Sequence, residues 1–143
     1  MNFTIESTYN GRALIEDDGI VGAATLTPGQ AVALTAGAGK PTATLVTTAV
    51  ADAIVTKGNT TGEACKFVRI FRGDVLKCTP MAADGTTALS SAEKTSLVAL
   101  VGAQAMRVAA TGACLDGVTT SGGKMELLSY NSTENIARTT IKA

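Results

Sequence analysis

The chain has 143 residues, 12 basic and 12 acidic side chains, and neither histidine nor tryptophan. Its commonest residues are small and uncharged: 24 alanines, 22 threonines and 15 glycines. A nucleic-acid partner is disfavoured, because such proteins normally carry a basic excess for phosphate contacts. The chain lacks both the ~20-residue apolar run of a membrane span and a signal-peptide pattern, so we expect synthesis in the cytoplasm and no membrane partner.

The first segment, residues 1–12, predicts an extended arm. Phe3 and Ile5 alternate with polar residues, Tyr9 follows, and Asn10-Gly11 is a turn signal. The sequence leaves two alternatives open. The segment is either the first strand of the chain's own sheet or an arm that reaches a neighbouring protein.

Residues 13–130 predict one domain built from short strands. Apolar and β-branched residues alternate with polar ones in runs that Gly, Pro and Asn turns separate. The predicted strands are 20–27, 30–35, 42–50, 51–55, 65–71, 75–79, 105–109 and 124–130. Residues 51–55 are either a separate strand or the far end of 42–50 after a bulge.

The strongest of these patterns runs over residues 65–71. Its alternation slips between Phe67 and Ile70, which predicts a bulge. Gly73-Asp74 predicts a tight turn, so we expect residues 65–71 to form a hairpin with residues 75–79.

Charged residues gather at two places in the sequence. Glu16-Asp17-Asp18-Gly19 predicts an exposed acidic turn, since a calcium loop needs further oxygen ligands at alternate positions. The predicted hairpin carries several basic residues, which are either a contact for an acidic protein surface or a solvated outer face. These basic residues are Lys66, Arg69, Arg72 and Lys77.

One helix is expected, at about residues 91–104. Ser90 and Glu93 have the spacing of a capping box, and Leu97 and Val101 fall on one apolar stripe. The alternative is a strand over residues 97–101. Residues 131–143 predict a tail, with one strand at residues 136–141.

The succession of short strands predicts an all-β fold: a compact β-barrel or β-sandwich of antiparallel strands, with at most one short helix and extended termini. The sequence does not alternate between strand and helix patterns, so a parallel α/β fold is disfavoured.

No motif in the chain predicts catalytic, cofactor-binding or metal-ligating residues. Gly37-Ala38-Gly39-Lys40 fails as a phosphate loop, because position 34 is Leu and position 41 is Pro. Cys65, Cys78 and Cys114 lack CxxC spacing and a histidine partner, which favours buried apolar thiols. A disulfide between Cys65 and Cys78 is the alternative, and a cytosolic setting disfavours it.

A resemblance adds to this interpretation. The run from Leu26 to Leu34 into a Gly-rich turn, the Thr/Ala/Val stretch to Val55, and Thr61-Gly62-Glu63 leading into the strand to Phe71 resemble small head decoration (cement) proteins of tailed bacteriophages. The closing strand Thr120–Leu127 is similar in character. The resemblance covers about residues 20–79. It implies a compact β-barrel or sandwich, often trimeric, bound over capsid-subunit junctions and without catalysis.

The resulting hypothesis is a structural virion protein on the capsid exterior, with the major capsid protein and its own copies, in a homotrimer, as partners. Repeated modest contacts on a symmetric shell suit such a light, neutral chain. The alternatives are another self-assembling virion component, such as a tail-tube, fibre or spike protein, or a small enzyme with an unrecognised site. The candidate contact residues are Phe3, Ile5, Tyr9, Lys66, Arg69 and Arg72.

Overall fold

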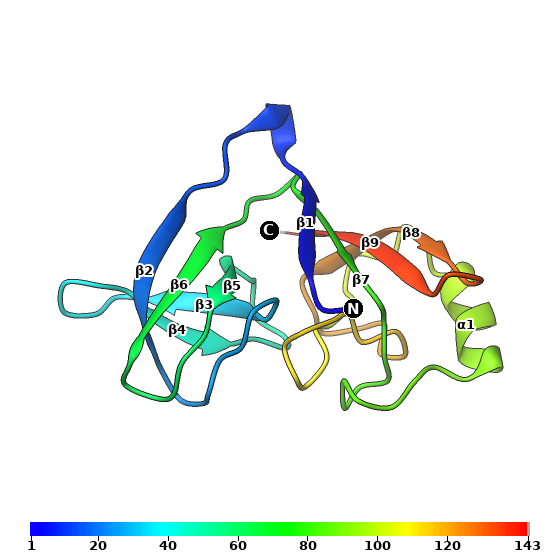
Figure 1. The fold of residues 1–143 in the computed structure, drawn as a ribbon. Coiled ribbons are helices and arrows are strands. Elements are labelled where there is room, and N and C mark those ends of the chain that lie inside the picture. The colour runs from blue at the N-terminus through cyan, green and yellow to red at the C-terminus, as the bar shows by residue number, and fades with distance from the viewer. Residues whose placement is uncertain (143) are drawn as a thin grey trace.

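The computed structural model describes residues 1–142, and Ala143, the end of the predicted tail, lies outside the described residues. Two lobes make up the molecule: a closed barrel with strand order β2-β4-β3-β5-β6 and a four-stranded sheet with order β1-β7-β9-β8 (Figure 1). The elements are β1 (Thr4–Ser7), η1 (Tyr9–Gly11), β2 (Glu16–Val21), β3 (Ala31–Thr35), β4 (Thr42–Leu45), β5 (Ala53–Lys57), β6 (Ala64–Arg69), β7 (Val75–Cys78), α1 (Ser91–Val98), β8 (Met125–Asn131) and β9 (Ile136–Ile141). The predicted all-β fold with one short helix is confirmed.

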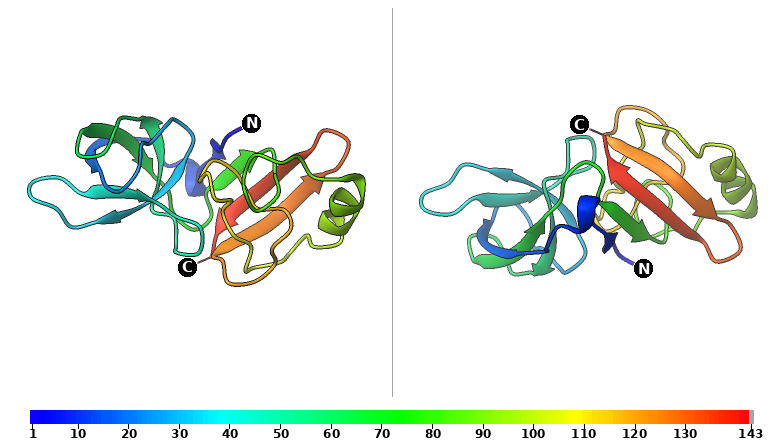
Figure 2. Two further views of the ribbon diagram at one scale, coloured as in Figure 1. Left: turned by 90° about the horizontal axis from the view of Figure 1, so that it is seen from below. Right: turned by 90° about the horizontal axis from the view of Figure 1, so that it is seen from above.

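The chain passes between the lobes twice. It leaves the sheet after β1, forms the whole barrel with β2 to β6, and returns to the sheet at β7. Both passages lie at the same end of the molecule, in the upper part of Figure 1 and at the centre of both views in Figure 2. We call this end the apex; it consists of residues 8–15 and 70–74.

The barrel is held mainly by antiparallel pairs. Strand β2 pairs with β6 from Glu16 opposite Val68 to Ile20 opposite Ala64. One pair departs from the antiparallel expectation, because β2 runs parallel to β4, with Ile20 opposite Thr42. That parallel contact closes the barrel between its first and third strands in chain order.

Two apolar cores form, and one of them joins the lobes. Small and medium side chains fill the barrel around Phe67, namely Val21, Leu26, Val32, Ala43, Ala53, Val55 and Cys65. The second core packs Ile54 and Ile70 from the barrel lobe against Leu76, Leu127 and other residues of the sheet lobe. The predicted slip between Phe67 and Ile70 therefore marks the passage from one core to the other. The register shift lies on the neighbouring strand, between Val55 and Lys57.

The expected hairpin of residues 65–71 and 75–79 is wrong. Strand β6 is occupied on both edges by β2 and β5, so no edge is left for β7. Strand β7 instead pairs with β1 and β9 in the other lobe. The turn at Gly73-Asp74 exists, and it redirects the chain from the barrel to the sheet.

The predicted acidic turn at residues 16–19 is also wrong. These residues begin β2 and lie beside β6, where Lys66 binds Asp18 and Arg69 binds Asp17. The opposing cations allow the run of carboxylates to form a strand, because opposite charges on neighbouring strands stabilise the pair.

The helix begins where the sequence predicts and ends earlier. Ser90 Oγ accepts a bond from the Glu93 N–H at 3.1 Å, and Glu93 accepts one from the Ser90 N–H at 2.9 Å, which confirms the capping box. The helix stops at Val98 instead of residue 104, and Gly102 has a φ of +96°, outside helical geometry. Residues 105–109 form isolated bridges at Met106 and Val108 instead of the predicted strand.

Both ends of the chain belong to the same sheet. Strand β1 pairs with β7, the first of the two alternatives for the N-terminal segment, and the predicted strand at residues 136–141 is β9. In this chain the terminal segments are therefore strands of its own body.

Candidate functional site

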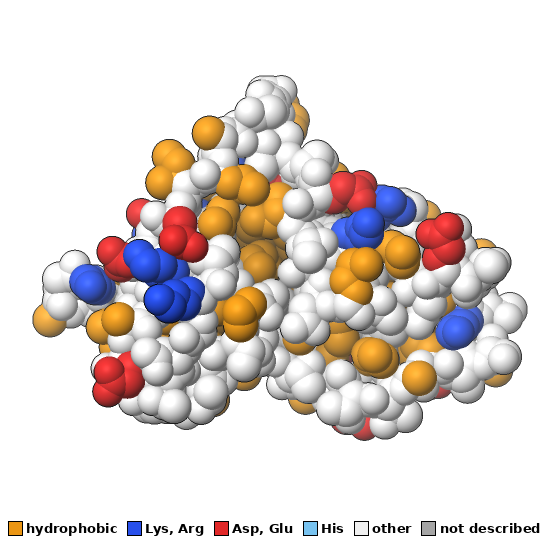
Figure 3. Space-filling view, viewed as in Figure 1, with side chains coloured by type: hydrophobic (Ala, Val, Ile, Leu, Met, Phe, Trp, Pro, Cys, Tyr) orange, Lys and Arg blue, Asp and Glu red, His pale blue; other side chains and the backbone are white. Residues whose placement is uncertain are grey.

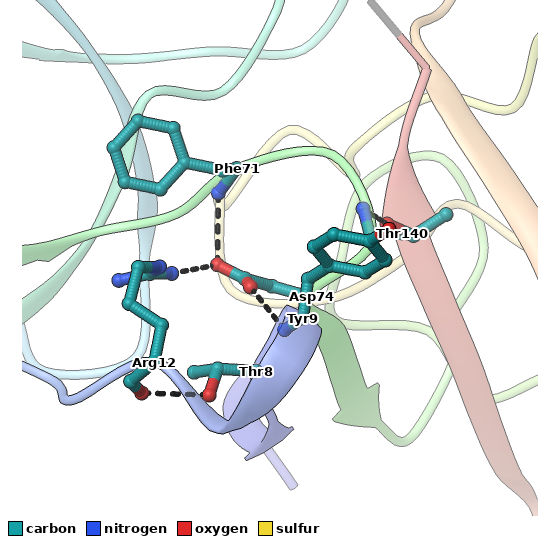
Figure 4. Close-up of polar contacts among 7 residues, drawn as sticks. Thr8, Tyr9, Arg12, Phe71, Asp74 and Thr140 are labelled. Atoms are coloured by element: carbon teal, nitrogen blue, oxygen red, sulfur yellow. Dashed lines mark hydrogen bonds and ion pairs between the residues drawn. The ribbon is translucent and has the colours of Figure 1, made fainter.

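A buried carboxylate ties the two passages between the lobes together. Asp74, on the second passage, is 1% exposed. Its Oδ1 accepts a bond from the backbone N–H of Tyr9 at 3.0 Å, and its Oδ2 accepts one from the N–H of Phe71 at 2.9 Å and binds the Arg12 guanidinium (Figure 4). Tyr9 and Arg12 belong to the first passage, so Asp74 holds the apex as one unit.

Gly73 allows the two passages to approach this closely. Its φ is +97°, which L-residues with a side chain rarely adopt, and an added Cβ would lie 3.0 Å from the Tyr9 ring. The Gly73 N–H donates to Thr140 Oγ1 at 3.0 Å, which connects the same turn to β9. The apex is therefore fixed to the sheet lobe as well.

Large apolar side chains are exposed on this fixed frame. Tyr9 is 63% exposed, Leu14 48%, Ile15 69% and Phe71 51%. We call these four exposed side chains of the apex together the apolar ridge. Figure 3 shows hydrophobic surface on the upper part of the molecule and in the hollow beneath it.

Two charged residues flank the apolar ridge without an ion pair of their own. Arg72 follows Phe71, is exposed, and makes no ion pair within residues 1–142. Glu16 follows Ile15 and accepts a hydrogen bond from Thr56 Oγ1 at 2.6 Å. Arg12 differs from both, because its guanidinium binds Asp74 and lies 4.6 Å from the centre of the Phe71 ring. Arg72 and Glu16 are therefore charged neighbours, in the sequence, of residues of the apolar ridge.

The three candidate contact residues of the N-terminal segment fall in different environments. Phe3 is buried in the core that joins the lobes, so its side chain is not available at the surface. Ile5 is half-buried against the same core. Tyr9 is exposed and belongs to the apolar ridge.

The basic candidates are not one surface either. Lys66 Nζ lies 2.8 Å from Asp18 Oδ1, and Arg69 Nε lies 3.3 Å from Asp17 Oδ2, so both cations are neutralised within the barrel lobe. The pKa of Lys66 is raised by the bond to Asp18, which keeps it charged. Arg72 lies at the apex and Lys77 on β7 of the other sheet.

Sequence reasoning missed most of the apolar ridge. Leu14 and Ile15 stand side by side ahead of an acidic run, and Phe71 closes a predicted strand, so each has the pattern of a core residue. A usable signal was present in the sequence. Leu14 is adjacent to Ile15, and Phe71 is adjacent to Ile70, so neither apolar pair alternates with polar residues as a strand with one buried face would. Their exposure follows only from knowing that both segments are passages between lobes.

A small pocket of about 180 Å³ lies on the barrel, lined by Asp18, Lys57, Asn59, Ala64, Cys65 and Lys66. Burial raises the pKa of the Cys65 thiol, so the neutral, weakly nucleophilic form dominates at neutral pH. Lys66 and Asp18 pair with each other at the wall of the pocket.

All three cysteines are free and buried, as the sequence favours. Burial raises the pKa of Cys78 to about 12. Among residues 1–142 no group of three metal-ligating side chains gathers. No helix in this described part of the chain has the length and apolar character needed to span a bilayer.

No family model, curated protein or solved structure matches this chain. The apolar ridge, whose backbone Asp74 holds at Tyr9 and Phe71, is the surface feature from which we infer a function.

Proposed function

We propose that this protein is a structural component of a tailed-bacteriophage virion that binds the outer surface of the capsid lattice and stabilises it. The observation that supports the proposal is the apolar ridge. Large apolar side chains gathered on a rigid exposed surface mark sites of protein–protein contact. The sequence resemblance to head decoration proteins supplies the class of partner, the major capsid protein.

Charge and composition agree with this role. The formal net charge is zero, so copies packed closely on a shell repel each other little. A shell presents the same contact many times, and neighbouring copies that touch each other raise one another's effective concentration. Modest contacts are then sufficient for full occupancy.

The test is binding to expanded, undecorated heads assembled from the major capsid protein of the phage that encodes this chain. Co-sedimentation should show saturation at a fixed ratio to the capsid subunit, and decorated heads should withstand heating better than bare heads. Absence of binding at any ratio rejects the proposal.

A matched pair of variants makes this test specific. Ile15→Ser removes an apolar side chain from the ridge, whereas Leu128→Ser removes an exposed one from β8, away from the apex. We expect Ile15→Ser to weaken decoration and Leu128→Ser to leave it unchanged. If the two variants decorate heads equally well, the apolar ridge is not the surface that binds the capsid.

A second candidate is a polymerising component, such as a tail-tube protein, and the open side of β1 favours it. Strand β1 is at the edge of its sheet, and such an edge can accept a neighbour's strand. The edge is only four residues long, its register shifts between Ile5 and Ser7, and Glu6 is tied to Arg138 at 2.8 Å. Short length, bulges and charges limit edge pairing, so decoration remains the proposal.

A further inference from the structure

The pocket on the barrel lies where three strands bring charged side chains together. Lys66 on β6 is opposite Asp18 on β2 and, on its other side, opposite Lys57 on β5. All three residues line the pocket, and Figure 3 shows basic and acidic side chains gathered over β2 and β6. The wall of the pocket therefore contains two cations and one anion.

The pairing of these groups leaves one positive charge unmatched. Lys66 Nζ binds Asp18 Oδ1 at 2.8 Å, whereas Lys57 makes no ion pair within residues 1–142. Two further charges act on the pair from outside the pocket, and they have opposite signs: Lys40 and Glu16. Like charges directly opposite each other on neighbouring strands destabilise a sheet. An anion held between Lys57 and Lys66 would offset their repulsion.

The segment that carries Lys57 is fixed before any ligand arrives. The next residue, Gly58, packs so closely against the backbone of Leu26 that an added Cβ would overlap the Leu26 carbonyl oxygen. Asn59 Nδ2 donates to the carbonyl of Ala64 at 3.2 Å, which leaves the second N–H of the amide for a ligand. A wall that is already ordered loses less conformational entropy when it binds.

The size of the pocket suits a small ligand. Its volume is about 180 Å³. A cavity of about 150 Å³ can hold benzene, whereas pockets for drug-sized ligands begin at about 300 Å³. A tetrahedral oxyanion such as phosphate or sulfate is no larger than benzene, so the volume admits it.

The carboxylate in the wall favours an oxyanion that carries a proton. An ionised carboxylate only accepts hydrogen bonds, and Asp18 has one oxygen bound to Lys66 and a second that is open to a donor. Hydrogen phosphate carries a proton that it can donate. Sulfate carries none, and a phosphate monoester, with a second pKa of about 6, carries almost none at about pH 7.5.

We propose that this pocket binds free hydrogen phosphate, with Lys57 and Lys66 as cations and Asp18 as the acceptor for its proton. The amide of Asn59 supplies a further donor. The site belongs to the barrel lobe and is separate from the apolar ridge, so the proposal goes beyond the binding of a capsid and does not depend on it.

The experiment titrates the full chain with inorganic phosphate at about pH 7.5 and follows the amide chemical shifts by NMR. Sodium chloride keeps the ionic strength constant, because salt alone screens charges. We expect saturable shifts concentrated at residues 57–59 and 64–66. Sulfate and methyl phosphate should bind at least about tenfold more weakly, since a hydrogen bond to a charged group contributes about a factor of ten in affinity. Bound phosphate should also raise the melting temperature.

Two variants and a matched control test the residues. Lys57→Met should weaken phosphate binding at least about tenfold, whereas Lys124→Met, which removes an exposed lysine outside the pocket, should leave it unchanged. Asp18→Asn replaces the acceptor by an amide that can donate, so this variant should bind sulfate as tightly as phosphate. A purely structural role of Asp18 would not change that preference. Circular dichroism shows whether each variant is folded.

Three results would overturn the inference. The shifts could fail to saturate or spread evenly over the surface, the wild type could bind sulfate as tightly as phosphate, or Lys57→Met could behave as Lys124→Met does. Decoration of heads is measured separately with the variants of the apolar ridge. Failure of phosphate binding therefore leaves the proposed function standing, and failure of decoration leaves the phosphate site standing.

Discussion

The apex and the paired strands β2 and β6 each contain a pair of arginine and aspartate, yet the two pairs differ in almost every other respect. At the apex, Asp74 is 1% exposed and accepts two backbone N–H bonds besides the Arg12 guanidinium. On the barrel, Asp17 and Arg69 are both about half exposed, with side-chain exposures of 48% and 47%, and share one bond of 3.3 Å. We therefore expect burial and the number of backbone donors, more than the contact between opposite charges itself, to determine how much each pair contributes to stability.

The largest expected effect is that of Asp74→Ala. The substitution leaves the N–H groups of Tyr9 and Phe71 without their acceptor and releases Arg12, which should lower the free energy of unfolding by about 3 kcal/mol. Chemical denaturation measures it. The matched variant Asp17→Ala should change the free energy of unfolding by less than about 1 kcal/mol, because exposed pairs contribute little. Equal losses from the two variants would contradict the comparison.

Substitutions of the two arginines should differ by a smaller amount in their effect on the free energy of unfolding. Arg12→Ala leaves the Asp74 carboxylate buried with only its backbone donors, and it removes the stacking on Phe71, for a loss of about 2 kcal/mol. Arg69→Ala should cost less than about 1 kcal/mol, although Arg69 also lies over an aromatic ring, that of Phe67 at 5.7 Å. The same denaturation measurement tests both, and a larger loss from Arg69→Ala would show that ring stacking outweighs the buried carboxylate.

The smallest effects concern exposed carboxylates in acid. Hydrogen bonds from the hydroxyl and N–H of Thr87, and from the N–H of Thr86, lower the pKa of Asp84 from 3.8 to about 2. A lowered pKa in the folded state stabilises the protein above the unfolded pKa, and this contribution is lost as the pH falls from 3.8 towards 2. The wild type should therefore melt at a higher temperature than Asp84→Asn at neutral pH, and the two melting temperatures should converge in strong acid.

Added salt should distinguish Asp84 from a second exposed carboxylate, Asp18. The bond with Lys66 also lowers the pKa of Asp18, and here the donor is a cation. Added salt should reduce the difference between wild type and Asp18→Asn, because salt screens exposed charges. The effect of Asp84→Asn should persist, since its donors are neutral. Loss of both differences in salt would mean that Asp84, too, is held by long-range charge.

Local structure was predictable from the sequence where it depends on side-chain alternation. The strand at residues 30–35 and the one at 136–141 correspond to β3 and β9, and the capping box at Ser90 marks the true start of the helix. In each case the signal lies within a few neighbouring residues. The all-β class follows from the sum of such signals.

The pairing partners of the strands and the passages between the lobes were not predictable in the same way. A strand, a Gly-Asp turn and a second strand have the sequence of a hairpin, and nothing local shows that both edges of β6 are already taken. The acidic run at Glu16–Gly19 lies in a strand beside Lys66 and Arg69, which are about 50 residues further along the chain and supply opposite charges. The apolar ridge depends on the same long-range pairings, which explains why Leu14, Ile15 and Phe71 were missed.

The double passage at the apex has a consequence for the order of folding. Strands β1 and β7 pair through Ile5 and Leu76, so their contact closes a loop that contains the entire barrel. Closing a long flexible loop carries an entropic cost, and a barrel that has already collapsed brings its two ends together in advance. The barrel is thus inserted in the chain between β1 and β7, and we expect these two strands to pair after it has formed. Asp74 then holds the two passages together.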